Sequence, residues 1–247
     1  DKDLLKSELT NNKLLRKSNF GNTEIYIFTH KESPNLMLEL GRLRELTFRT
    51  AGGGTGKEVD IDKYDTAEDP YIQLIVWDPD ELEIIGGYRY ILGESTLDDY
   101  KSKLATANLF EFSDDFLKKY LPYTIELGRS FVQPAYQQGA NRRKGLFALD
   151  NLWDGLGALT IEYPEMKYYF GKVTMYKHFN FDARSYILSF LKMYFGDKQN
   201  LIIAKSPLSL DYEKYSKEFS GNNYEKEYKK LQKIVKDKGE RIPPLVN

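Results

Sequence analysis

Two side chains that could do acid–base chemistry lie three residues apart, the carboxylate of Glu126 and the guanidinium of Arg129. Polarity alternates around them, which predicts a strand that ends at Pro134. A partly buried glutamate can serve as a general base, because burial raises the pKa of a carboxyl group toward neutral pH. The alternative interpretation is a salt bridge between the two side chains. One predicted side of the strand holds Thr124, Glu126, Gly128 and Ser130, and the other holds Ile125, Leu127, Arg129 and Phe131.

A loop with glycines and basic residues follows this strand and leads into a predicted helix. The apolar residues from Leu146 to Leu156 are spaced like one face of that helix. A loop between a strand and a helix start presents backbone N–H groups and the positive end of the helix dipole to a phosphate. Many such turns carry no ligand, and that alternative stays open. The residues that we expect to hold a ligand phosphate are Gly139, Ala140, Asn141, Arg142, Arg143, Lys144 and Gly145.

The sequence GGGTGK at 52–57 resembles a nucleotide-binding P-loop, but two positions do not fit. The pattern needs glycine at its first position and Ser or Thr after the lysine. Ala51 and Glu58 occupy those positions here. We therefore interpret this stretch as a glycine connector that orders over a substrate.

An acidic loop follows the glycine connector and contains Asp60, Asp62 and Asp65. It lacks the central glycine and the terminal glutamate of a calcium loop. Two interpretations stay open, a solvated acidic face and a site in which Asp62 and Asp65 bind a cationic amine.

Composition excludes several classes of protein. The 247 residues include no cysteine and two histidines, so thiolate catalysis, disulfides and a histidine-rich metal centre are excluded, and we expect no metal. The lack of cysteine fits a cytoplasmic protein. The 36 basic and 37 acidic residues nearly cancel, which argues against nucleic-acid binding. No apolar run approaches the roughly 20 residues that span a bilayer.

The predicted elements describe a single α+β domain over residues 1–247, an α/β/α sandwich with a mixed, mostly antiparallel central sheet flanked by helices. Residues 1–20 form an N-terminal helical extension in this prediction, and residues 206–247 form a charged helical C-terminal extension. Asn35 is the expected N-cap of the first long helix. The other predicted strands cover 24–29, 71–78, 83–93 and 168–175, and the predicted helices cover 35–49, 146–159, 181–195 and 224–235.

Four motifs in one order resemble a known family. They are R-x-x-x-F at Arg44 and Phe48, G-x-E-x-D-x-D-x-Y-D at 56–65, G-x-x-R ending at Arg89, and E-x-x-R at Glu126 and Arg129. The series resembles the acyl-homoserine-lactone synthases, and more closely the hemolysin-like ornithine- and glycine-lipid N-acyltransferases. Both are branches of the GNAT superfamily, and the likeness covers about residues 24–205.

The resemblance implies transfer of an acyl group, long-chain or 3-hydroxy, from a pantetheine thioester to the amine of an amino acid such as glycine or ornithine. The co-substrate is acyl carrier protein or CoA, with no permanently bound cofactor. Catalysis would fall to Glu126 as the base, with Arg129 and Arg89. Acceptor binding would involve Arg44, Phe48, Asp62 and Asp65, and the 139–145 loop would receive the donor phosphate and the acidic carrier protein.

Three departures from the family pattern bear on these expectations. Glycines around Gly54 replace a tryptophan of the lactone synthases, which speaks against lactone formation. The 137–142 stretch keeps only part of the usual CoA loop, which speaks against a standard CoA contact and is compatible with a carrier-protein donor. The lipid-type enzymes continue past a Pro-Pro pair like the one at 243–244, which leaves a further segment after Asn247 open. Two alternative functions stay open, an acetyl-CoA-dependent N-acetyltransferase and a non-catalytic acyl- or carrier-protein-binding module. The lysine-rich C-terminal helix permits peripheral membrane contact.

Overall fold

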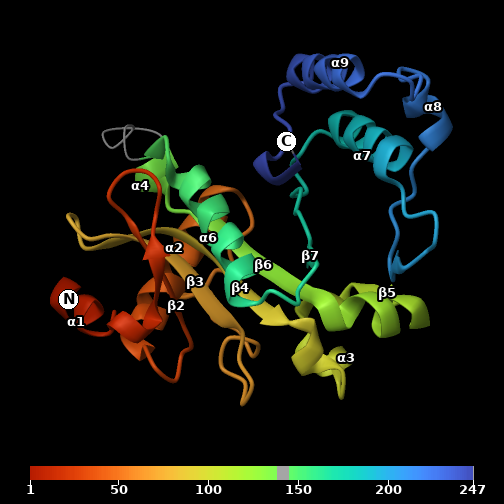
Figure 1. Cartoon of the computed structure of the whole chain (residues 1–247). Helices are drawn as coiled ribbons and strands as arrows, with labels where there is room; N and C mark the ends of the chain where they lie inside the picture. Colours follow the sequence, from red (N-terminus) through yellow and green to blue (C-terminus); the bar gives the residue numbers. More distant parts are fainter. Residues whose placement is uncertain (138–144, 247) are drawn as a thin grey trace. The chain divides into compact units, whose positions relative to one another are not determined.

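The computed structural model describes residues 1–137 and 145–246 (Figure 1). The chain forms two compact units. The first unit comprises residues 1–105 and 117–171, and the second comprises 106–116 and 172–247. The expectation that the whole chain acts as a single domain stays a prediction.

A six-stranded mixed sheet forms the centre of the first unit. Its strand order is β1-β2-β3-β4-β6-β7, and every neighbouring pair is antiparallel except β6 and β7, which are parallel. This sheet confirms the predicted fold class. The strands are β1 Leu14–Lys17, β2 Glu24–Phe28, β3 Ile72–Asp78, β4 Glu83–Leu92, β6 Thr124–Val132 and β7 Tyr168–Gly171.

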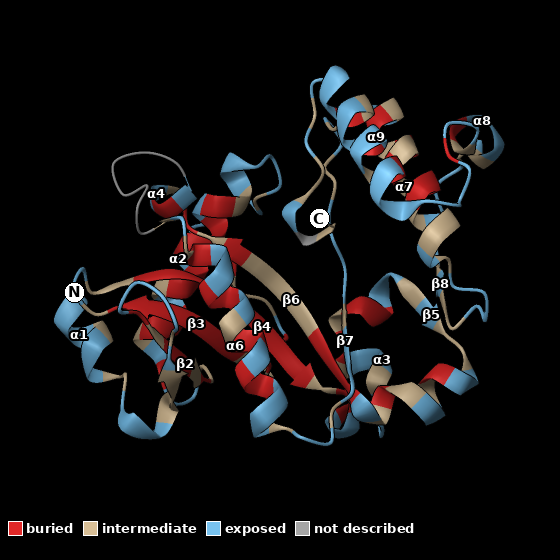
Figure 2. Cartoon of the chain, turned by 45° about the horizontal axis from the view of Figure 1, so that its top comes forward, coloured by how far each residue is buried: buried red, intermediate tan, exposed pale blue. Residues whose placement is uncertain are grey.

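Two long helices cover opposite faces of this sheet. Helix α2 (Pro34–Thr50) buries Leu36, Leu40 and Leu43 against residues of one face, and α6 (Ala148–Glu162) buries Leu152, Leu156 and Leu159 against the other. The leucines recur every three or four residues, which places them on one side of each helix. The central strands are buried over most of their length as a result (Figure 2).

A β-bulge interrupts the predicted alternation of β6. Gly87 of β4 pairs with Phe131, and Arg89 pairs with Gly128, so β6 carries one residue more than β4 over this stretch. The extra residue lies at Arg129, whose φ is 52°. In an unbroken strand Ile125 and Phe131 would lie on the same face, because they are an even number of residues apart. Instead Ile125 packs on the α6 face and Phe131 packs on the α2 face. The predicted unbroken alternation was therefore wrong beyond Leu127.

The N-terminal residues differ from the predicted helical extension. Helix α1 (Lys2–Ser7) is short, a 3₁₀ turn follows at Asn11–Lys13, and Leu14–Lys17 form an edge strand. Pairing with β2 directs Leu14 and Leu15 to opposite faces of the sheet, which a helix could not do. The expected N-cap Asn35 lies inside α2, and Ser33 is the N-cap.

The second unit has its own core. Helices α7 (Phe181–Phe195), α8 (Tyr212–Ser216) and α9 (Tyr224–Asp237) surround an aromatic and aliphatic cluster around Phe190, and β5 (Phe110–Phe112) pairs with β8 (Ile202–Ala204). The strand predicted over 168–175 was too long, because β7 ends at Gly171 and the following residues belong to this unit.

No described helix is both long and apolar enough to cross a bilayer. Several short elements complete the described chain. They are α3 Tyr100–Lys103, α4 Pro134–Gln137, a π-turn at Phe116–Tyr120 and 3₁₀ turns at Gly93–Thr96, Ala105–Asn108, Leu121–Tyr123 and Pro244–Val246.

Candidate active site

A cluster of charged side chains lies on the α2 side of the sheet in the first unit. Its members come from α2, from the acidic loop and from three neighbouring strands, so residues that are up to 85 positions apart in sequence meet. We call it the arginine–carboxylate cluster, and its members are Arg44, Asp60, Asp62, Asp65, Gln73, Arg89, Glu126 and Arg129, with Tyr71 beside them.

Arg44 and Asp65 form a fully buried ion pair. Arg44 Nη1 lies 3.1 Å from Asp65 Oδ1, and both side chains have no exposed surface. The amide of Gln73 bridges them, because it accepts from Arg44 and donates to Asp65 at 3.2 Å. Burial lowers the pKa of Arg44, which Asp65 partly offsets. Burial alone would raise the pKa of Asp65, but Arg44 and Arg89 outweigh it and hold the pKa below its ordinary value.

Arg89 joins this pair to Asp62. Its Nη1 lies 2.7 Å from Asp62 Oδ1 and 3.1 Å from Asp65 Oδ2. The guanidinium also covers the ring of Tyr71, with 4.9 Å between its carbon and the ring centroid. Burial would lower the pKa of Arg89, but Asp65 and Asp62 raise it above its ordinary value, so the side chain stays charged.

Arg129 reaches the same carboxylates because of the bulge. Its Nε lies 2.8 Å from Asp60 Oδ2, and its Nη2 lies 3.1 Å from Asp62 Oδ2. In a regular strand Glu126 and Arg129 would face opposite sides, since side chains alternate with a period of two. The extra residue brings both to the α2 side. Arg129 and Asp62 each keep 28% of their side chain exposed, while Arg44, Asp65 and Arg89 are almost completely buried.

Glu126 is buried and receives a short hydrogen bond. The Tyr71 hydroxyl donates to Glu126 Oε1 at 2.6 Å, and the backbone N–H of Ala105 donates to the same hydroxyl oxygen at 2.8 Å. Burial, followed by the charge of Glu126, raises the pKa of Tyr71 well above its ordinary value. The phenol therefore keeps its proton.

The parallel pairing of β6 with β7 ends at Leu127, one residue beyond Glu126. The last registered pair is Leu127 with Gly171, while β6 continues to Val132. Between Gly128 and Val132 the described strands leave this side of β6 without a strand partner. Backbone N–H groups at such a position can donate to a ligand.

Six of the site residues predicted from the sequence meet in the cluster: Arg44, Asp62, Asp65, Arg89, Glu126 and Arg129. Phe48 does not, because it packs with the apolar residues between α2 and the sheet. Its predicted role in acceptor binding stays a prediction.

The predicted phosphate loop can be assessed only at its last residue. Gly139, Ala140, Asn141, Arg142, Arg143 and Lys144 lie outside the described residues. At Gly145 an added Cβ would lie 1.9 Å from the Tyr136 carbonyl oxygen, so the position has a packing reason to be glycine.

Sequence reasoning missed Tyr71, Gln73 and Asp60 as members of the cluster. Gln73 left a signal, since it is the one uncharged polar residue in the apolar run from Tyr71 to Trp77. A buried amide needs hydrogen-bond partners, so its position should have pointed to a buried polar network. Tyr71 left no such signal, because a tyrosine at the start of a strand is common.

The glycine connector is tethered by a carboxylate from α2. Glu45 accepts hydrogen bonds from Thr55 N at 2.8 Å, Thr55 Oγ1 at 2.7 Å and Gly56 N at 2.9 Å. These bonds, with the Thr55 hydroxyl bond the largest, lower the pKa of Glu45 to about 2. The anion-binding N–H groups of this loop therefore hold the protein's own carboxylate, which agrees with our rejection of a nucleotide-binding P-loop.

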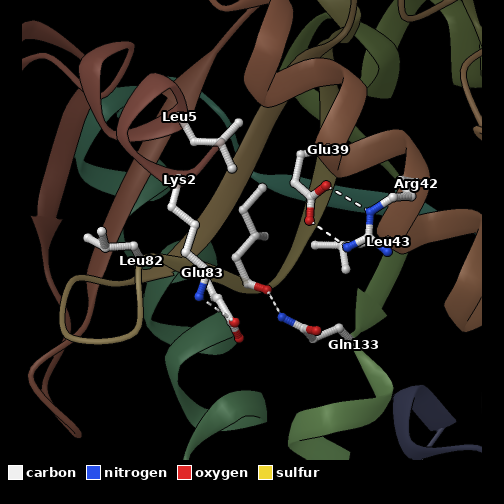
Figure 3. A pocket seen from close by; sticks show the side chains of 9 residues that line it. Lys2, Leu5, Glu39, Arg42, Leu43, Leu82, Glu83 and Gln133 are labelled. Carbon is white, nitrogen blue, oxygen red and sulfur yellow. Dashed lines mark hydrogen bonds and ion pairs between the residues drawn. The ribbon is translucent and has the colours of Figure 1, made fainter.

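A small pocket of about 150 Å³ lies between α1, α2 and β4 (Figure 3). Its charged side chains pair with each other, Lys2 with Glu83 at 2.8 Å and Arg42 with Glu39 at 2.7 Å. No member of the arginine–carboxylate cluster lines it. The pocket is therefore separate from the arginine–carboxylate cluster.

Comparison with known proteins shows the family of the chain. Residues 43–144 match the family described as acetyltransferase (GNAT) domain, which includes every cluster member. Glycine N(alpha)-acyltransferase of Phocaeicola vulgatus is 53% identical over all of the chain and 77% of its own length. The protein of the same name from Bacteroides thetaiotaomicron is also 53% identical, over 74% of its length. No solved structure matches the chain significantly.

Proposed function

The chain belongs to the GNAT family of N-acyltransferases, and from that premise we propose that it transfers a long-chain acyl group to the amine of glycine to form an amino-acid lipid. The similarity to the two relatives supports amino-acid N-acyltransferase activity. It therefore argues against the alternative of a non-catalytic binding module. The choice of glycine is supported by the names of both relatives, glycine N(alpha)-acyltransferase. The observation that carries the mechanism is the buried carboxylate of Glu126 where β6 and β7 cease to pair.

Glu126 is the proposed general base. An amine is mostly protonated at neutral pH, and only the free amine attacks a thioester. The amine nitrogen bonds to the thioester carbonyl carbon, and the carbon–sulfur bond then breaks. Of the two protons that the ammonium loses, one leaves through Glu126 to solvent and the other goes to the departing thiolate. Backbone N–H groups of β6 beyond Leu127 are the proposed donors to the oxyanion.

Arg129 and Asp62 are the proposed contacts to the acceptor amino acid. They are the members of the ion-pair network that keep exposed surface, so a small zwitterion can reach them. Arg129 would face the acceptor carboxylate and Asp62 its ammonium. Arg44, Asp65 and Arg89 would hold these two in place from beneath.

We further propose an acyl carrier protein as donor, with acyl-CoA as the alternative that GNAT enzymes in general use. The support comes from sequence, because three consecutive basic residues at 142–144 suit an acidic carrier protein. A peripheral contact with the membrane surface is part of the same proposal, since the product would be a lipid.

The test offers acyl donors of increasing length, on carrier protein and on CoA, with glycine, ornithine or no acceptor. Free thiol is followed over time, and the product is identified by mass spectrometry. We expect long-chain acylglycine, and a fall in kcat of about 10²- to 10⁴-fold in Glu126→Gln. The matched control is Glu83→Gln, which removes a charge from β4 outside the cluster. Full turnover by Glu126→Gln would overturn the assigned base, and acetyl transfer alone would favour an ordinary acetyltransferase.

A further inference from the structure

We infer that Tyr71 is a positioning residue that fixes the Glu126 carboxylate and keeps it ionised for proton abstraction. This inference rests on the proposed role of Glu126 as the base. The Tyr71 hydroxyl donates to Glu126, and through this bond its effect on the reaction would pass.

The hydrogen-bond directions around the phenol are determined by its single proton. Ala105 N–H can only donate, and it donates to the Tyr71 oxygen at 2.8 Å. The one hydroxyl proton is therefore available to Glu126, whose Oε1 lies 2.6 Å away. An oxygen that accepts this proton is best satisfied as part of a carboxylate, because hydrogen bonds to a charged acceptor are stronger than neutral ones.

The ring of Tyr71 is held on several sides. Tyr71 is 1% exposed, and its backbone N–H donates to the Tyr64 carbonyl at 2.9 Å while its carbonyl accepts from Gln73 Nε2 at 3.0 Å. The guanidinium of Arg89 covers the ring face, and the Tyr64 ring meets it edge-on at 5.8 Å between centroids. The hydroxyl thus has a fixed location from which to orient Glu126.

Among the contacts described for the pair, the charged group against the Tyr71 ring is the guanidinium of Arg89. Arg89 approaches from β4, and it is itself held by Asp62 and Asp65 of the acidic loop. These groups remain in place when only the phenol oxygen is removed. The variant Tyr71→Phe therefore removes the hydrogen bond to Glu126 and the acceptor of the Ala105 N–H, and it keeps the ring and these charges.

The experiment compares Tyr71→Phe with Tyr90→Phe in the full chain, using the donor and acceptor that the activity assay identifies. Tyr90 is equally buried, and its hydroxyl lies 3.1 Å from that of Tyr163 in the core on the α6 face. For Tyr71→Phe we expect kcat to fall about 10- to 100-fold, the effect of a lost hydrogen bond to a charged group. The acidic limb of the pH–rate profile should move to higher pH, and the KM for the acceptor should change less than kcat. Tyr90→Phe should keep wild-type kcat and pH profile.

The double variant Tyr71→Phe/Glu126→Gln separates this inference from the proposed function. If Tyr71 acts through Glu126, its removal should not lower the residual rate of Glu126→Gln any further. Additive losses in the double variant would overturn the inference. It would also be overturned if Glu126→Gln is inactive while Tyr71→Phe keeps the wild-type kcat and pH profile. Full activity in Glu126→Gln would instead remove the proposed base, and the inference with it. Thermal unfolding of all variants checks that each is folded under the assay conditions.

Discussion

At the scale of single residues, buried charges must be paired if the chain is to fold. Three guanidinium groups and three aspartates of the cluster lie within 3.1 Å of an oppositely charged partner. The desolvation cost of such pairs can exceed their mutual attraction, so the network is weak evidence for stability. In the proposed mechanism its value lies in holding Asp62 and Arg129 at fixed places for the acceptor.

We predict that Arg44→Met destabilises the protein by about 3–5 kcal/mol, because it removes one of the two cations that pair with the fully buried Asp65. Arg42→Met on the same helix should cost no more than about 1 kcal/mol, since the Arg42–Glu39 pair is exposed. Urea unfolding of both variants gives the two values. Equal losses would mean that Asp65 does not depend on Arg44.

At the scale of elements, the bulge in β6 is the feature on which the site depends. It adds one residue to β6, and the backbone at Arg129 adopts the left-handed conformation that side chains disfavour. Such strain persists only where the surroundings hold it, and it is common at functional sites.

We predict that Arg129→Gly is more stable than Arg129→Ala by about 1 kcal/mol, because glycine adopts positive φ without strain. Both variants lack the guanidinium, so their difference reports the backbone alone. The same comparison at Ser130 should have the opposite sign, since glycine weakens an ordinary strand position by roughly 0.5–1 kcal/mol. Denaturant unfolding of the four variants measures both differences, and a common sign would contradict the bulge.

At the scale of the whole molecule, each compact unit has a core of its own. The first unit packs two helices against the sheet, and the second packs α7 and α9 around Phe190. Both tryptophans, Trp77 and Trp153, belong to the first unit. Tryptophan fluorescence therefore reports on that unit, while far-UV circular dichroism reports on helices of both.

We predict that Phe190→Ala lowers the stability of the second unit by about 3–5 kcal/mol. Part of the circular dichroism transition should move to lower denaturant, and the fluorescence transition should stay. Leu74→Ala, in the core of the first unit, is the matched control and should move the fluorescence transition. If every probe shifts together in Phe190→Ala, the chain unfolds as the single domain that the sequence suggests.

The sequence by itself determined the fold class and most of the elements, because apolar periodicity is a local property. The two apolar runs at 71–78 and 83–92, separated by the short turn Asp78-Pro79-Asp80, indicated an antiparallel pair, and leucine spacing indicated α2 and α6. The ordered motifs also named six residues that meet in the cluster, although no local pattern explains why they meet.

Only the tertiary structure decided how these residues face one another. Alternation alone places Glu126 and Arg129 on opposite sides of their strand, and a bulge that depends on pairing with β4 reverses this. The partners of Glu126 and Arg129 also come from distant segments, Tyr71 for the carboxylate and the Asp60–Asp62 loop for the guanidinium. Hydrogen bonds and ion pairs act over about 3 Å, and sequence separation carries no information on which distant groups come that close.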